Sequence, residues 1–213
     1  MELIDKQDEG WQRRLADIVV TGGSLLALSP LFVLIALAIK LDSRGPVLYR
    51  QERVGKDEVP FEMLKFRSMV AGADRMGPKI SGNRDPRVTR LGHLLRRTKV
   101  DELPQLWNVL RGDMTLVGPR AEVPEMIRHY TPEERWILSF KPGLTGPGQI
   151  HFTTEQADVL DAVDEVEAFY VEHQLRNKLA KDLKYLETRG WAKDADIIWR
   201  TVKVILSIRR PTA

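Results

Sequence analysis

The sequence contains no cysteine among its 213 residues. This absence excludes disulfide bonds, thiol catalysis and cysteine-rich zinc sites. Histidine is also scarce, and the four that occur lack the spacing that is typical of metal ligands; they are His93, His129, His151 and His173. Any catalysis must therefore depend on carboxylates, cations, hydroxyls or amides.

A strong overall charge is absent too. The chain has 33 Lys and Arg against 30 Asp and Glu, a net charge of +3 and a pI near 9.2. No basic field or recognised motif therefore indicates a nucleic-acid binder. The sequence also has no internal repeat, and its length favours one domain with an appendage.

The longest apolar run lies near the N-terminus. Between Asp17 and Lys40, 22 residues carry no charge, which is about 33 Å of helix against about 30 Å of bilayer hydrocarbon. A cleaved signal peptide is disfavoured by the length of the run and by the acidic residues before it. A spanning helix, a re-entrant hairpin and a buried core helix remain. Basic residues at both ends, such as Arg14 and Arg44, disagree with a spanning helix because they mark both ends as cytoplasmic.

Ser29-Pro30 lies near the middle of this run. Pro30 removes a backbone donor and leaves the carbonyl of Leu26 without its helical partner. The Ser29 hydroxyl can compensate by bonding to the carbonyl four residues earlier. We therefore predict a re-entrant membrane helix hairpin over residues 18–39, within an N-terminal segment 1–44 that precedes a catalytic domain at 45–213.

The rest of the chain predicts a helix-rich α+β fold with interfacial helices around a small domain. Residues 47–66 alternate around a glycine-containing turn and predict a short β-hairpin. Residues 69–86 predict a long irregular loop. Residues 87–99 predict a basic amphipathic helix, which suits either an anionic membrane surface or a solvated protein surface. Lys65 and Arg67 share one strand face, where two cations are more often solvated than part of a site.

Two adjacent carboxylates occur in "VDELPQLWNVLRGDM", residues 100–114. The ordinary interpretation is a helix start, in which Asp101 caps the helix and the following proline occupies its first turn. A catalytic interpretation is compatible with it, because a helix N-terminus keeps a carboxylate ionised and attracts phosphate. Two Gly/Pro-rich loops follow at 110–120 and 141–150, and both could present backbone N–H groups to phosphate.

The order of these segments resembles the bacterial sugar transferases, the monotopic phosphoglycosyl transferases of cell-envelope glycan assembly. The resemblance depends on the Ser-Pro-containing apolar arm, "KFRSM", "LRRTKVDELPQLWNVLRGDMTLVGPR" and "KPGLTG". It is dense over residues 11–150 and looser as far as residue 206. It implies transfer of a sugar 1-phosphate from a nucleoside diphosphate sugar, with a UDP-sugar expected, to polyprenol (undecaprenyl) phosphate, with release of the nucleoside monophosphate.

The resemblance also implies roles for individual residues. Asp101 would be the nucleophile that forms a covalent phosphosugar intermediate, and Glu102 would bind Mg²⁺, with Mn²⁺ as an alternative. The substrate-binding cations would be Lys65, Arg67, Arg96 and Arg120. The break in the membrane helix would be at Ser29 and Pro30.

The sequence departs from the family pattern in two places. The usual Pro-Arg-Pro is Pro119-Arg120-Ala121 here, which keeps the arginine but removes one stiffening residue. Residues 151–160 replace the commoner polar loop, which is expected to touch the sugar or the nucleotide, so the sequence does not identify the sugar or the base of the nucleotide. Residues 196–206 have helical apolar spacing and fit either an interfacial helix or a core helix.

The resemblance implies a monotopic protein of the bacterial inner membrane, with its catalytic domain on the cytoplasmic face and in contact with membrane lipid. No nucleic acid is expected as a partner, and a homo-oligomer is compatible with the sequence. A membrane-tethered scaffold without chemistry is the alternative function. It explains the apolar arm but gives no reason for Asp101 and Glu102 to lie among basic and Gly/Pro-rich segments.

Overall fold

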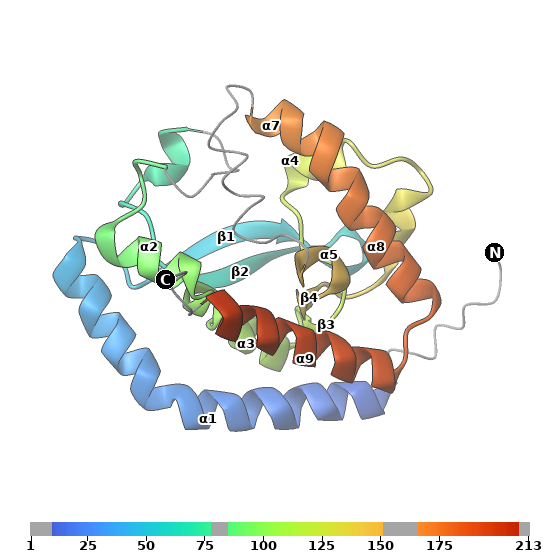
Figure 1. Ribbon diagram of the computed structural model, residues 1–213, viewed down its shortest axis with the longest axis horizontal. Helices are drawn as coiled ribbons and strands as arrows, with labels where there is room; N and C mark the ends of the chain where they lie inside the picture. Colours follow the sequence, from blue (N-terminus) through green and yellow to red (C-terminus); the bar gives the residue numbers. More distant parts are fainter. Residues whose placement is uncertain (1–9, 78–84, 151–165, 209–213) are drawn as a thin grey trace.

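The computed structural model describes residues 10–77, 85–150 and 166–208, and it is helix-rich with two small sheets (Figure 1). The α-helices are α1 Trp11–Asp42, α2 Arg90–Arg97, α3 Gln105–Arg111, α4 Pro124–Ile127, α5 Pro147–Ile150, α7 Val166–Phe169, α8 Arg176–Glu187 and α9 Trp191–Ile208. The strands are β1 Leu48–Val54, β2 Pro60–Phe66, β3 Thr115–Val117 and β4 Gly143–Thr145. Short 3₁₀ turns are η2 Lys56–Glu58, η3 Ala73–Arg75, η4 Val100–Glu102 and η5 Glu134–Ser139, and η6 Tyr170–Leu175 is a π-helical turn.

The apolar N-terminal segment forms one helix of 32 residues, α1, which bends about midway along its length (Figure 1). Pro30 lies inside this helix, and the Ser29 hydroxyl donates to the Leu26 carbonyl at 2.8 Å. That carbonyl, three residues earlier and not four, is the one that Pro30 leaves without a donor. The predicted compensation by Ser29 is therefore confirmed. We predicted a hairpin of two arms, whereas the structure has one continuous helix that bends. The membrane topology stays a prediction.

The N-terminal half of α1 is fixed to the domain by polar contacts. Arg14 donates to two carbonyls at the C-terminal end of α3, both at 2.6 Å. The Asp17 carboxylate accepts the Thr115 hydroxyl at 2.8 Å and the Leu116 N–H at 3.1 Å, both from β3. Charged residues at this end of the helix therefore satisfy backbone groups that α3 and β3 leave open.

The C-terminal half of α1 is fixed to the same domain by apolar contacts. Ile35 and Ile39 form a buried cluster with Phe66 of β2 and Leu95 of α2. Between the two attachments α1 is largely uncovered: only 11% of its most apolar stretch is buried. Among the described residues it is the one helix long and apolar enough to cross a membrane.

The predicted β-hairpin is confirmed, since β1 and β2 pair antiparallel with Tyr49 opposite Lys65. The two Gly/Pro-rich loops contribute more than turns. They form β3 and β4, which pair in parallel with Val117 opposite Thr145. A Cβ on Gly143 would lie 2.1 Å from the backbone nitrogen of Gly118, so this close approach requires glycine.

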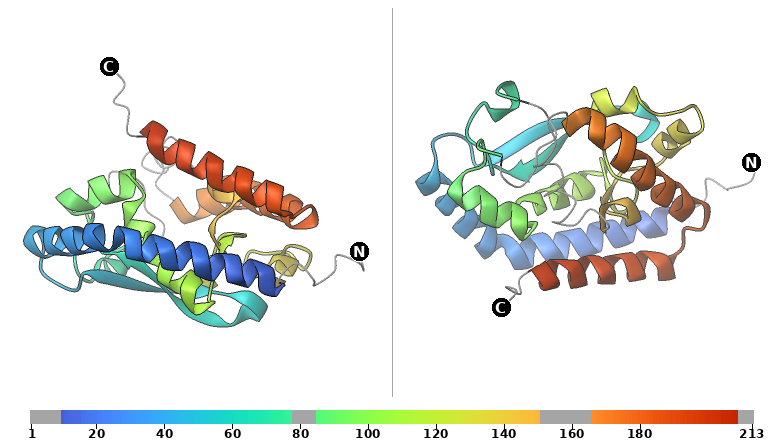
Figure 2. Two further views of the ribbon diagram at one scale, coloured as in Figure 1. Left: turned by 90° about the horizontal axis from the view of Figure 1, so that it is seen from below. Right: turned by 45° about the horizontal axis from the view of Figure 1, so that its top comes forward.

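The basic helix predicted at 87–99 is α2, which is shorter and begins after Thr89, whose hydroxyl accepts the Gly92 N–H at 3.0 Å. The C-terminal helix is α9, and it has both a buried and an exposed apolar edge. Ile197 lies in the main hydrophobic core with residues of α8 and α4, whereas Trp199 is exposed. Figure 2 shows α9 and α1 on one side of the molecule. An interfacial position for α9 stays a prediction.

Candidate active site

The two adjacent carboxylates lie in η4, a single 3₁₀ turn between α2 and α3. The expectation that Asp101 caps the following helix is wrong. That helix, α3, begins at Gln105, Pro104 occupies its cap position, and no side chain caps it. The physical reason is a tight turn at Lys99, which has a left-handed conformation with φ 58° and separates η4 from α2.

Glu102 is held by an ion pair from the neighbouring sheet. Lys65 of β2 donates to Glu102 Oε1 at 3.2 Å, and both side chains are largely buried. Burial alone would raise the pKa of Glu102, but Lys65, Lys99 and Arg120 outweigh this effect and keep the pKa below its ordinary value. Glu102 is therefore ionised at neutral pH.

Asp101 has a different environment from its neighbour. It is 7% exposed, and its Oδ1 is buried without a hydrogen-bond partner among the residues that the structure describes. Burial and the adjacent Glu102 charge raise its pKa to about 6, against the opposing effect of Lys65 and Lys99. Two neighbouring carboxylates with such different pKa values are typical of paired groups that have separate chemical roles.

Three of the four predicted cations surround this pair. Lys65 contacts Glu102, Arg96 lies close enough to lower the pKa of Asp101, and Arg120 lies close enough to lower that of Glu102. Arg120 is oriented by its backbone N–H, which donates to Asp182 Oδ2 at 3.2 Å. All of these cations and both carboxylates line one cavity of about 1130 Å³.

The fourth predicted cation, Arg67, lines the same cavity but is engaged by α1. Its guanidinium donates to the Ser43 carbonyl at 2.7 Å, to the Ser43 hydroxyl at 3.0 Å and to the Ile39 carbonyl at 3.4 Å. A Cβ on Gly45 would lie 2.2 Å from Arg67 Nη1, so this packing also requires a glycine, which has φ +129°. These contacts make Arg67 a cap for the C-terminal end of α1, and its role in substrate binding stays a prediction.

Sequence reasoning did not identify a second polar group on the cavity wall. The Tyr170 hydroxyl donates to Glu122 Oε1 at 3.0 Å, and Lys178 Nζ donates to the Tyr170 hydroxyl at 3.0 Å. Lys178 Nζ also lies 4.4 Å from the centre of the Tyr170 ring. Tyr170 begins the π-helical turn η6, and such turns often occur at functional sites.

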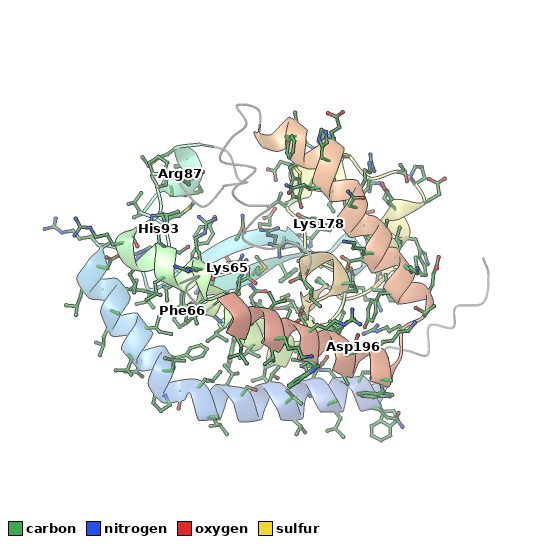
Figure 3. All side chains as sticks on the ribbon, viewed as in Figure 1. Lys65, Phe66, Arg87, His93, Lys178 and Asp196 are labelled. Atoms are coloured by element: carbon green, nitrogen blue, oxygen red, sulfur yellow. The ribbon has the colours of Figure 1, made fainter. Side chains whose placement is uncertain are left out.

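Lys178 lies across the cavity from Lys65: one comes from α8 and the other from β2 (Figure 3). Burial and the nearby Arg120 lower the pKa of Lys178 to about 7, so this side chain titrates in the neutral range. Arg53 Nη1 lies 3.6 Å from Glu122 Oε2 and completes the group. One signal in the sequence could have suggested this second polar group: Glu122 lies only two residues after Arg120.

The residues present fit a magnesium ion whose remaining ligands come from the phosphates of the substrate and from water. Within the described ranges no three His, Cys, Asp or Glu side chains form a metal-binding group. Mg²⁺ does not need such a cage, because it commonly uses one or two carboxylates together with substrate phosphates and water. The ionised Glu102 supplies a carboxylate oxygen of this kind. Residues 151–160, where the sequence departs from the family pattern, lie outside the described residues.

Comparison with known proteins supports the predicted family. The model of the family described as "Bacterial sugar transferase" matches residues 9–208. The chain is 38% identical over 92% of its length to the "UDP-glucose:undecaprenyl-phosphate glucose-1-phosphate transferase" of Caulobacter vibrioides, of which it covers 70%. It is 39% identical over 93% of its length to the "Undecaprenyl-phosphate glucose phosphotransferase" of Komagataeibacter xylinus, of which it covers 35%.

A third relative is closer to this chain in length. The "Exopolysaccharide production protein PSS" of Rhizobium leguminosarum bv. phaseoli is 38% identical over 89% of the chain, which covers 92% of that protein. The chain thus spans about a third of one relative, 70% of another and nearly all of the third. The family model and each of these three relatives match almost the whole chain. The chain therefore belongs to the bacterial sugar transferase family.

Proposed function

We propose that this protein transfers a sugar 1-phosphate from a UDP-sugar to undecaprenyl phosphate, releases UMP, and thereby begins the assembly of an envelope glycan. The names of several relatives, which combine a UDP-sugar with undecaprenyl phosphate, support this substrate pair. Because the chain spans only part of some of these relatives, the activity is our inference for this chain.

The observation that carries the proposal is the difference between the two adjacent carboxylates. Glu102 is ionised and paired with Lys65, whereas Asp101 has a buried oxygen that the described protein leaves without a hydrogen bond. A carboxylate nucleophile needs an oxygen that is free to attack. Asp101 meets this requirement, and Glu102 is better placed to bind a cation than to attack phosphorus.

The reaction we propose has two displacements at one phosphorus atom. An Asp101 oxygen attacks the phosphorus that carries the sugar, and the bond from that phosphorus to the bridging oxygen breaks, so that UMP leaves with the electron pair. A phosphate oxygen of the acceptor then attacks the same phosphorus and breaks its bond to Asp101. The products are the polyprenyl diphosphosugar and the free carboxylate.

Cations are needed because a carboxylate must approach an anionic diphosphate. Two like unit charges 4 Å apart repel by about 4 kcal/mol at an effective dielectric constant of 20. Lys65, Arg96 and Arg120 lie around the pair and offset this repulsion. Glu102 would hold Mg²⁺ or Mn²⁺, which when bound neutralises charge on the phosphates.

We also propose a monotopic arrangement on the cytoplasmic face of the bacterial inner membrane. A helix that spans the bilayer has its ends on opposite sides of about 30 Å of hydrocarbon. Here Asp17 and Ile39, near the two ends of α1, both contact the same domain. This arrangement supports a helix that enters and leaves the membrane on one side, with its exposed apolar side chains in the lipid.

The direct test is UMP release from UDP-glucose, UDP-galactose and UDP-N-acetylgalactosamine, with and without undecaprenyl phosphate. We expect one of the sugars to give multiple turnovers only when the acceptor is present, together with a polyprenyl diphosphosugar product. Glu122→Gln is the control for Asp101→Asn, because it removes the charge of another carboxylate that lines the same cavity. It should retain more activity than Asp101→Asn. The absence of UMP release with every donor would favour a scaffold role.

A further inference from the structure

The cavity that contains the carboxylate pair changes character along its length. One part of its wall is charged and includes Lys65, Arg120 and the two carboxylates. Another part is apolar and is formed by Val20 of α1 and by α9. The two parts belong to the same continuous space, so a single molecule with one charged and one apolar end can contact both.

The apolar wall is built from one edge of α9. Ile198, Val202 and Ile205 all line the cavity, and their i, i+4, i+7 spacing places them on one helical face. The Thr201 hydroxyl of α9 also lines the cavity and is hydrogen-bonded to the Thr145 hydroxyl at 2.6 Å, which fixes α9 against β4. The apolar wall therefore has a defined position relative to β4.

The helices α1 and α9 are joined at one end and separate toward the other. Arg13 of α1 forms a buried ion pair with Asp194 of α9, and the Tyr185 hydroxyl donates to the same carboxylate at 2.5 Å. The Arg13 guanidinium also lies 5.1 Å from the ring of Trp191. From this junction the two helices run in the same direction and diverge toward the C-terminal end of α9 (Figures 1 and 2).

Apolar side chains of α1 and α9 both line the cavity and reach the surface. Val20 and Val202 line the cavity and are half-exposed, and Val19, Leu26 and Leu206 on the same two helices are more exposed still. Exposed apolar side chains gathered on two helices of a folded domain indicate contact with lipid or another apolar partner.

We propose that the opening between α1 and α9 admits the acceptor from the membrane, with its first isoprene units against Val20, Ile198, Val202 and Ile205 and its phosphate among the cations at Asp101. The inference rests on the proposed function. The combination of a cationic wall and an apolar wall selects the acceptor as the occupant, because the acceptor joins a phosphate to a long hydrocarbon chain. A nucleotide sugar is polar throughout and gains little from an apolar wall.

The first test separates use of the acceptor from use of the donor. Val202→Trp places a large side chain in the opening, and Leu206→Trp is the matched control because Leu206 lies on the same helix but does not line the cavity. We expect Val202→Trp to raise the KM for undecaprenyl phosphate at least tenfold, whereas UMP release from the UDP-sugar alone stays within twofold of wild type. Leu206→Trp should leave both values within twofold.

Val20→Trp, which changes the α1 side of the cavity, should also raise the KM for undecaprenyl phosphate. Because it leaves α9 unchanged, a matching increase cannot result from a folding defect in α9. The proposal is overturned if both tryptophan variants keep the wild-type KM for undecaprenyl phosphate. It is also overturned if they reduce donor-only UMP release as much as overall turnover, because the wall would then serve the carboxylate pair and not the acceptor.

The second test requires no turnover and so remains decisive if the proposed reaction fails. A polyprenyl phosphate with a diazirine on its second isoprene unit is photolysed with the full chain in detergent. We expect adducts on the α1 peptide containing Val20 or on α9, competed by undecaprenyl phosphate and weakened by Val202→Trp. Adducts confined to peptides outside α1 and α9 would overturn the proposal.

Discussion

Lys65 and Glu102 form an ion pair between β2 and η4, with 3.2 Å between Nζ and Oε1, and Asp101 beside it has a buried oxygen without a hydrogen-bond partner in the described structure. Adjacent carboxylates repel each other, so a cation that pairs with one of them also determines which carboxylate is left without an ion pair and is available as a nucleophile. Lys65 neutralises Glu102. The proposed division between a cation-binding Glu102 and an attacking Asp101 follows from this contact.

Removing Lys65 should therefore damage both stability and activity. Lys65→Met leaves Glu102 buried without its partner, which typically costs about 3 kcal/mol of unfolding free energy. The double variant Lys65→Met/Glu102→Gln should recover most of this loss without recovering activity. Arg50→Met is the control, because its ion pair with Glu62 is exposed (66% and 60%) and should contribute less than about 1 kcal/mol. Denaturant unfolding that gives equal losses for Lys65→Met and Arg50→Met would contradict the assignment.

Lys178 should make stability depend on pH above neutrality. Burial lowers its pKa in the folded protein to about 7, from an ordinary value of 10.5. Between these two values the unfolded chain binds more protons, so the free energy of unfolding should rise with pH. Relative to Lys178→Met, wild type should gain about 1 kcal/mol per pH unit between pH 7.5 and 9.5. The exposed Lys184→Met control should leave this slope unchanged, and a difference between wild type and Lys178→Met that does not vary with pH would disprove the assignment.

Metal removal should abolish turnover without unfolding the protein. The described residues form no closed protein cage for a metal, so a chelator should leave the melting temperature unchanged while it stops UMP release. Glu102→Gln should both slow turnover and raise the Mg²⁺ concentration needed for half-maximal rate. Full turnover in excess chelator would exclude a divalent cation from the reaction.

The two ends of α1 should lie on the same side of the membrane. The chain has no cysteine, and Trp11 and Arg44 are exposed, so Trp11→Cys and Arg44→Cys each introduce a single, exposed thiol. Neither thiol should react with an impermeant maleimide in intact cells, and both should react after permeabilisation. Labelling of one position alone in intact cells would establish a spanning helix.

The parts of the fold that sequence reasoning predicted are those fixed by neighbouring residues. The β1–β2 hairpin follows from alternation around a turn, and the Ser29 bond to Leu26 follows from the donor that Pro30 lacks. The carboxylate pair and its neighbours Lys65, Arg96 and Arg120 were identified by their motifs. Glu122 and Lys178 were not, because they are brought together by packing between segments 56 residues apart.

Tertiary contacts also give two predicted residues partners that the sequence does not indicate. Arg67, whose role in substrate binding stays a prediction, lies beside the end of α1 and satisfies open carbonyls there. Asp101 was expected to cap a helix, but the left-handed turn at Lys99 places it in η4, ahead of α3. In both cases the motif predicted a charged group at the cavity, and the tertiary contact determined which partner it has.

The proposed mechanism requires a covalent bond between Asp101 and a sugar phosphate, and the mass of the protein after incubation with donor alone reveals whether this bond forms. Wild type, given the active UDP-sugar and Mg²⁺ without acceptor, should release up to one equivalent of UMP. It should also gain the mass of one sugar phosphate on the peptide that contains Asp101. Asp101→Asn should fold, bind the donor and remain unmodified. An unmodified wild type that turns over only when donor and acceptor are both bound, with intersecting initial-rate plots, would contradict a covalent intermediate and leave Asp101 without its role as nucleophile.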